Sequence, residues 1–167
     1  IIYIDTPGGR VDSAEKIKDA ILGSDIPIVA HVKRGTSAGA LISIAADYII
    51  MTPGSHMGDA EPIPVTEKNV AYVSAEFRST AEKRNKDPFI AAGMVDKELD
   101  VPGFPPGKLV NLTASQAMEI DYADATLATT DQVLEFMDWS GADIVSIEPD
   151  HKIRLAQFLT RSGVVSA

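Results

Sequence analysis

The chain has 167 residues, the size of one typical domain. Apolar residues make up 45% of it and charged residues 23%, so a hydrophobic core is possible and wholesale disorder is excluded. Its 24 acidic and 15 basic residues give a net charge of −9, which argues against a nucleic-acid partner because phosphate binding needs a surplus of Lys and Arg. It has no cysteine, which excludes disulfides, thiolate catalysis and Cys-ligated metal.

The acidic residues are concentrated in one segment. Between Ser115 and Asp150 there are nine acids and no Lys or Arg, and the remaining 15 acids balance the 15 bases. Such a run is typical of a solvated surface. No stretch of about 18 apolar residues that would span a bilayer occurs. The apolar opening of the chain reads as a strand in progress, so we expect a domain of a longer protein.

The first third of the chain alternates strands and helices. Three apolar runs predict strands: Ile1–Ile4, Ile26–Val32 and Tyr48–Met51. Asp12 and Glu15 predict a capping box for a helix that ends near Gly23, and Ala38–Ala46 predicts a buried helix. This order predicts a parallel sheet with right-handed crossovers.

The remainder is predicted to be mostly helical, with short strands. A long polar helix is expected at 66–84, followed by a short helix at Pro88–Val95 and a Pro-rich loop at Val101–Gly107. Three short strands are expected at Leu109–Leu112, Ala125–Ala128 and Ile144–Ile147. Helices are expected from Thr113, with a capping box to Gln116, from Thr130, and from His151. We therefore expect residues 1–167 to form a single α/β domain.

Two glycine-containing turns each follow a predicted strand. Adjacent glycines in Pro7-Gly8-Gly9 allow backbone N–H groups to face a cleft, although a simple turn is the plainer interpretation. The second turn, from Gly35 to Gly39, matches the pattern G-x-S-x-G. It predicts Ser37 as a nucleophile and the N–H of Ala38 as an oxyanion donor. The alternative is that Ser37 is an ordinary helix N-cap.

A serine nucleophile needs a base, and the chain has three histidines. His31 lies inside an apolar strand and is predicted to be a core residue, while His56 is expected in the turn after the third strand. His151 follows the last predicted strand. One alternative is therefore an α/β-hydrolase-like esterase with Ser37, Asp131 and His151 as its triad.

The two glycine turns together resemble the ClpP/crotonase superfamily, and within it the signal-peptide-peptidase-like proteases. The most similar group is the NfeD family of membrane-bound serine proteases. The likeness rests on these segments: Ile2–Gly9, Gly35–Gly39, Ala45–Ile49, Pro53–Ser55, Met57–Gly58, Asn85–Pro88, Ala92–Asp96, Leu112–Ala117, Tyr122–Asp124 and Leu155–Thr160. It implies an α/β, ClpP/crotonase-like fold built from β-β-α units with a parallel sheet.

The resemblance also implies a Ser–Lys protease without a cofactor or a metal ion. Ser37 would attack a peptide carbonyl, and the N–H groups of Gly9 and Ala38 would hold the oxyanion. The residues implied to bind substrate are Gly8, Gly58 and Asp59. Where ClpP has its catalytic His, this chain has Gly58-Asp59-Ala60, so a ClpP-type triad is not expected.

The base is where the chain departs from the family pattern. The resemblance implies a Lys on the long helix, and an ungapped alignment places Arg78 there. An arginine holds its proton too tightly to act as a base. Three possibilities follow: Lys68 or Lys83 serves in a rearranged site, Arg78 orients the site while another group or water is the base, or the domain is a catalytically weak scaffold that binds a partner peptide.

The resemblance further implies a membrane-anchored, extracytoplasmic protein that forms a homo-oligomer. A leader would precede Ile1, and residues 151–167 would lead toward a membrane region after Ala167. The implied substrates are hydrophobic segments of a stomatin- or flotillin-like membrane protein, with substrate walls at Val101–Gly107 and Asp59–Thr66. A crotonase-type acyl-CoA site is a further alternative, in which Ser37 would have no role.

Overall fold

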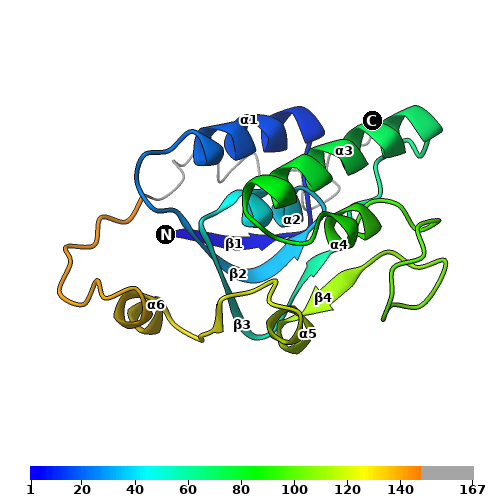
Figure 1. The fold of residues 1–167 in the computed structure, drawn as a ribbon. Coiled ribbons are helices and arrows are strands. Elements are labelled where there is room, and N and C mark those ends of the chain that lie inside the picture. The colour runs from blue at the N-terminus through cyan, green and yellow to red at the C-terminus, as the bar shows by residue number, and fades with distance from the viewer. Residues whose placement is uncertain (148–167) are drawn as a thin grey trace, which may run out of the picture.

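The computed structural model describes residues 1–147, which form one sheet with helices on both sides (Figure 1). Three parallel strands make up its centre: β1 (Ile2–Thr6), β2 (Val29–Thr36) and β3 (Tyr48–Gly58). The sheet order is β1-β2-β3-β4, where β4 (Asn111–Thr113) is antiparallel to β3, and β5 (Ala125–Thr126) pairs with β3 in parallel. The predicted parallel sheet is confirmed.

The helices cover the two faces unequally. One face carries α1 (Val11–Leu22), α2 (Ala38–Ala45) and α3 (Glu67–Lys83), with α4 (Pro88–Gly93) beside α3 (Figure 1). The uncharged α2 is the most buried of them, since Ala40, Leu41 and Ile44 are 2% exposed or less. It lies between the sheet and the other two helices, as its apolar sequence predicts.

The opposite face carries α6 (Thr130–Phe136), whose Val133 packs against Val29 and Ile50 of the sheet. Beside β4, α5 (Ala114–Glu119) begins with the predicted capping box between Thr113 and Gln116. A second capping box, at the start of α6, was not predicted. Both boxes satisfy backbone N–H groups that a helix leaves unpaired at its start.

β2 and β3 are longer than predicted. Thr52–Ser55 of β3 bulge out opposite Lys33 of β2, and pairing then resumes as Arg34 with His56 and continues to Thr36 with Gly58. Pro53 and Lys33 end neither strand because they fall at this bulge, where no ladder hydrogen bond is required. His56 therefore lies within a strand, and its expected place in a turn is wrong.

The start of α1 also differs from the prediction. The N-cap is Arg10, without a side-chain cap, and Asp12 lies in the first turn, where its carboxylate binds the Arg10 guanidinium at 2.9 Å. The Asp12–Glu15 capping box is therefore wrong. Because the glycine turn ends at Arg10, the helix begins at Val11, earlier than the side-chain pattern indicates.

The predicted strand at Ile144–Ile147 does not form. These residues have no regular secondary structure, and Ile144, Val145 and Ile147 are 63%, 84% and 94% exposed. A β-branched sequence makes a strand only where it pairs with another strand, and these residues pair with none of the described strands. The predicted helix from His151 and the expectations for residues 151–167 lie outside the described residues.

The predicted solvated acidic surface is largely confirmed. From Glu119 to Asp143 the acidic side chains are exposed, with the exception of Asp124. Asp124 accepts a hydrogen bond from the Ile49 N–H at 2.7 Å and contacts Lys86 at 3.4 Å. One acid of the run therefore has a structural role in tying β3 to the segment before β5.

Candidate active site

Ser37 lies in the sharp turn between the end of β2 and the start of α2. Its backbone angles, φ 56° and ψ −119°, fall in a region that a non-glycine residue rarely occupies. Such a conformation costs about 1–3 kcal/mol and persists only where the surroundings impose it. Here the Ser37 N–H donates to the carbonyl O of Gly58 at 2.9 Å. This is the geometry of a nucleophile elbow, which presents the hydroxyl group away from the sheet.

The turn after β1 lies directly against Ser37. A Cβ atom placed on Gly8 would lie 2.8 Å from Ser37 Cβ and 3.2 Å from Ser37 Oγ, and Gly8 has φ +127°. The Gly8 N–H donates to Thr6 Oγ1 at 3.1 Å, so it is already occupied. Glycine at this position is therefore required both by the backbone and by the closeness of Ser37.

Two free backbone donors lie beside the serine. Within residues 1–147, neither the Gly9 N–H nor the Ala38 N–H has a hydrogen-bond acceptor. A Cβ on Gly9 would lie 3.9 Å from Ala38 Cβ, so the two residues are neighbours. The N–H of Ala38 also lies at the positive end of α2. The arrangement provides the two donors that an oxyanion hole requires.

Ser37, Gly9 and Ala38 line one cavity of about 320 Å³ between α1, α2 and α3. Its other lining residues are mostly apolar: Val11, Ala14, Leu41, Ala60, Pro62, Ile63, Val73 and Phe77. The only ionisable side chains in the lining are Arg10 and Glu61. The Glu61 carboxylate binds Lys97 Nζ at 2.9 Å, and this hydrogen bond raises the pKa of Lys97 above its usual value. The cavity suits an apolar side chain.

The three candidate base residues lie outside this cavity. Arg78, Lys83 and Lys68 are all exposed on α3. Successive residues point about 100° apart on a helix, and α3 turns Val73 and Phe77 toward the cavity. None of the lysines between residues 1 and 147 donates a hydrogen bond to the Ser37 hydroxyl. The structure brings Ser37, Gly9 and Ala38 together, and it leaves the three candidate bases apart from them.

The predicted substrate-binding residues are close to Ser37 but outside the cavity. Gly58 supports Ser37 through its carbonyl, and the exposed Asp59 donates its N–H to Val110 O at 3.1 Å. The cavity wall begins one residue later, with Ala60–Ile63. The stretch expected as a wall at Asp59–Thr66 thus contributes in part, whereas Val101–Gly107 does not line this cavity.

A family model described as the N-terminal domain of NfeD1b matches residues 1–147. The chain belongs to the NfeD1b N-terminal domain family. It is 35% identical over 173 residues to the membrane protein NfeD1b of Bacillus subtilis, which covers 99% of this chain and 40% of that protein. It is 30% identical over 115 residues to a membrane-bound protease of Pyrococcus horikoshii, which covers 60% of this chain and 26% of that protein. The chain therefore spans less than half the length of these relatives.

Solved structures confirm the predicted ClpP/crotonase-like fold of this NfeD-family domain. A mutant of the 1510-N membrane-bound stomatin-specific protease, in complex with a substrate peptide, superposes with a TM-score of 0.80 at 22% identity, over 96% of this chain and 82% of that chain. ClpP1 from Listeria monocytogenes gives 0.59 at 16% identity, over 79% and 75% of the two chains. Enoyl-CoA hydratase from Thermoplasma volcanium gives 0.51 at 15% identity, over 92% and 54%.

The histidines of this NfeD-family domain do not approach Ser37 in the described region. His31 is buried, its Nε2 lies 3.1 Å from Leu127 O, and its ring meets Tyr3 edge to face at 5.4 Å, which confirms it as a core residue. Asp131 is on α6, which packs at the start of β2, whereas Ser37 follows the end of that strand. At about 3.3 Å per residue, the strand separates them by roughly 25 Å. His151 lies outside the described residues.

Sequence reasoning missed the residues of α3 that shape the cavity, Val73 and Phe77. The spacing of Val70, Val73 and Phe77 does indicate an apolar stripe along α3 and was a usable signal. Glu61 falls within the expected wall at Asp59–Thr66. Over residues 1–147, no group of three or more His, Asp or Glu side chains is placed to hold a metal ion, and no helix is long and apolar enough to cross a membrane.

Proposed function

We propose that this domain is the serine peptidase domain of an NfeD-family membrane protein and that Ser37 is its nucleophile. The observation that carries the proposal is the position of Ser37, which has a strained backbone conformation. It lines the same cavity as Gly9 and Ala38, whose N–H groups are free. The Pyrococcus relative, named a membrane-bound protease, supports the same reaction class. In acyl transfer, Ser37 Oγ attacks the peptide carbonyl carbon. Each oxyanion donor stabilises the transition state by about 3 kcal/mol.

The proposed substrate is an apolar segment of a stomatin- or flotillin-like membrane protein. The apolar lining from Leu41, Val73 and Phe77 suits an apolar side chain next to the scissile bond. A solved relative is described as stomatin-specific and holds a substrate peptide, which supports this partner class. We also propose that the domain belongs to a membrane-anchored, extracytoplasmic and homo-oligomeric protein; the relatives named membrane proteins support the first of these properties.

The proton of Ser37 requires an acceptor, and the Ser–Lys form of the proposal assigns it to a lysine of α3. Lys68 lies on the first turn of α3, five residues after the cavity-lining Ile63, and Lys83 lies at the far end of the helix. Lys68 is therefore the stronger candidate. For either lysine to accept the proton, α3 must rotate or shift when substrate binds. Arg78 stays protonated at neutral pH, so in this form it takes no part in the proton transfer.

The second candidate function is a peptide-binding scaffold without turnover. One observation favours it: the face of α3 over Ser37 carries Val73 and Phe77, with no ionisable group. The same apolar cavity would then hold a partner segment without cleaving it. The α/β-hydrolase alternative has less support, because Asp131 is at the other end of β2 from Ser37.

Labelling by a fluorophosphonate probe tests the first function against the second. We expect the parent chain to be labelled and Ser37→Ala to lose at least about 100-fold in rate, because only an activated serine reacts. Ser13→Ala, at an exposed serine on α1, is the matched control and should label like the parent. An unlabelled parent that still binds an apolar peptide would support the scaffold.

The same assay ranks the candidate bases. If Lys68 accepts the proton, Lys68→Ala should slow labelling by about 100-fold, within the range for general-base catalysis, while Lys83→Ala and Arg78→Ala stay near the parent. A parent-like rate for Lys68→Ala would exclude it as the base.

A further inference from the structure

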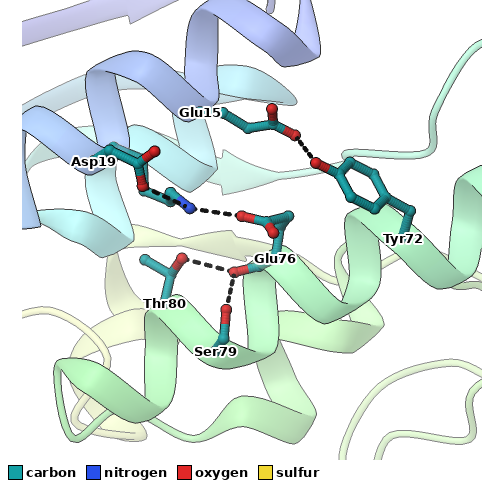
Figure 2. A network of polar contacts seen from close by, with 7 residues as sticks. Glu15, Asp19, Tyr72, Glu76, Ser79 and Thr80 are labelled. Atoms are coloured by element: carbon teal, nitrogen blue, oxygen red, sulfur yellow. Dashed lines mark hydrogen bonds and ion pairs between the residues drawn. The ribbon is translucent and has the colours of Figure 1, made fainter.

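A polar cluster joins α1 to α3 beside the cavity (Figure 2). Lys18 Nζ lies 2.6 Å from Glu76 Oε2 and 3.0 Å from Asp19 Oδ1. Next to this pair, Tyr72 Oη donates a hydrogen bond to Glu15 Oε1 at 2.7 Å. Two side chains of α1 are thus bonded to two side chains of α3.

This cluster is adjacent to the cavity wall on both helices. On α1, Lys18 follows the cavity-lining Ala14 by four residues and so lies on the same face of the helix. On α3, Tyr72 and Glu76 form one ridge, and each immediately precedes a cavity-lining residue, Val73 or Phe77. The spacing of the two helices at the cluster therefore determines how far the walls of the cavity stand apart.

The central pair is shielded from solvent. The side chain of Lys18 is 11% exposed and that of Glu76 is 25% exposed, whereas that of Asp19 is 70% exposed. Burial disfavours the Lys18 ammonium, but the hydrogen bonds that it donates to Glu76 and Asp19 outweigh this effect and raise the pKa of Lys18 above its usual value. A shielded ion pair adds little net stability compared with apolar residues of the same size. Its directional bonds do fix the relative position of the two helices.

We propose that the Lys18–Glu76 pair, together with the Glu15–Tyr72 bond, sets the spacing of α1 and α3 and thereby the size of side chain that the cavity beside Ser37 admits. Lys18 and Glu76 are positioning residues, since neither lines the cavity. The inference rests on the proposed function only in taking a substrate side chain as the occupant of the cavity. The spacing itself is measurable without any reaction.

The first experiment measures that spacing. The chain has no cysteine, so Lys16→Cys on α1 and Ala75→Cys on α3, both exposed, introduce two clean sites for spin labels. In Lys18→Met, we expect the interspin distance to broaden and lengthen by about 2 Å, the size of helix shifts in known transitions. Asp19→Asn, which removes only the exposed partner of Lys18, is the control and should leave the distance unchanged. An unchanged distance in Lys18→Met overturns the proposal whether or not Ser37 reacts.

The second experiment measures which side chains the cavity admits. Ser37 is labelled with a small alkyl and a bulky aryl fluorophosphonate, and the ratio of the two rates is compared between variants. We expect Lys18→Met and Glu76→Gln each to raise the relative rate of the bulky probe by about fivefold or more, since pocket size discriminates on this scale. The double variant Lys18→Met/Glu76→Leu, with an apolar pair in place of the ions, should return toward the parental ratio.

The two experiments separate the failure of this inference from that of the proposed function. If no variant is labelled but the spin-label distance changes as expected, the serine peptidase is rejected and the spacing role stands. If labelling proceeds with an unchanged ratio while the melting temperature falls, the pair is structural only and the inference is rejected. The inference is also rejected if the labelling rate of Ser37 falls while the ratio of the bulky to the small probe stays unchanged.

Discussion

Gly58→Ala is expected to destabilise the fold by about 3 kcal/mol or more, since it combines overpacking with backbone strain. Gly58 has φ +135°, and a Cβ there would overlap Val110 O and lie 2.9 Å from Asn111 Cα. Both contacts are with backbone, which cannot rotate away as a side chain does. Relief requires β3 and β4 to separate, and these strands pair at Gly58 and Asn111.

Gly54→Ala is the matched control for this substitution. Gly54 lies in the same strand and also has positive φ, +75°, but a Cβ there meets nothing within 4 Å. It should cost only about 1 kcal/mol, the penalty for alanine in a glycine conformation. Urea unfolding followed by circular dichroism measures both. Equal losses in the two variants would show that the close approach of Val110 is unimportant.

Gly8→Ala is expected to reduce fluorophosphonate labelling of Ser37 by about 100-fold or more, the effect of losing an oxyanion donor. The added methyl group would lie 2.8 Å from Ser37 Cβ, so either Ser37 or the turn must move. Movement of the turn displaces the adjacent N–H of Gly9, and movement of Ser37 displaces the nucleophile. The reaction is impaired in both cases.

Gly103→Ala is the control that separates the loss of Ser37 labelling from the cost of backbone strain alone. Gly103 has φ +87°, nothing lies within 4 Å of its hypothetical Cβ, and it is remote from the Ser37 cavity. Its labelling rate should stay within about twofold of the parent, while its stability falls by about 1 kcal/mol. A Gly8→Ala protein that labels at the parental rate would contradict the placement of the Gly8–Gly9 turn against Ser37.

Most of the fold could be predicted from local patterns. The buried α2, the long α3 and the capping box at Thr113 follow from periodicity and side-chain chemistry within a few residues. The errors concern strands whose extent depends on pairing with residues distant in the chain. β3 continues past Pro53 because its later residues find a partner in β2, and Ile144–Ile147 stay unpaired because no described strand meets them.

For the active site, too, the local features could be predicted from the sequence and the long-range contact could not. Ser37 could be found from its pentapeptide, and the glycine turn from its own residues. Their contact depends on the parallel register of β1 and β2, which pairs Thr6 with Gly35 and so brings both turns to the same edge of the sheet. That register is a long-range property.

By itself the sequence excluded a nucleic-acid partner through its net charge of −9 and thiolate chemistry through its lack of cysteine, and its glycine turns and family motifs determined the fold class and the candidate nucleophile. Only the tertiary structure decided which side of α3 faces the cavity beside Ser37. Helix rotation is set by packing, and Val73 and Phe77 turn inward because burying them removes apolar surface from water. That packing leaves Arg78 in solvent and places Lys18 against Glu76, neither of which a linear alignment could reveal.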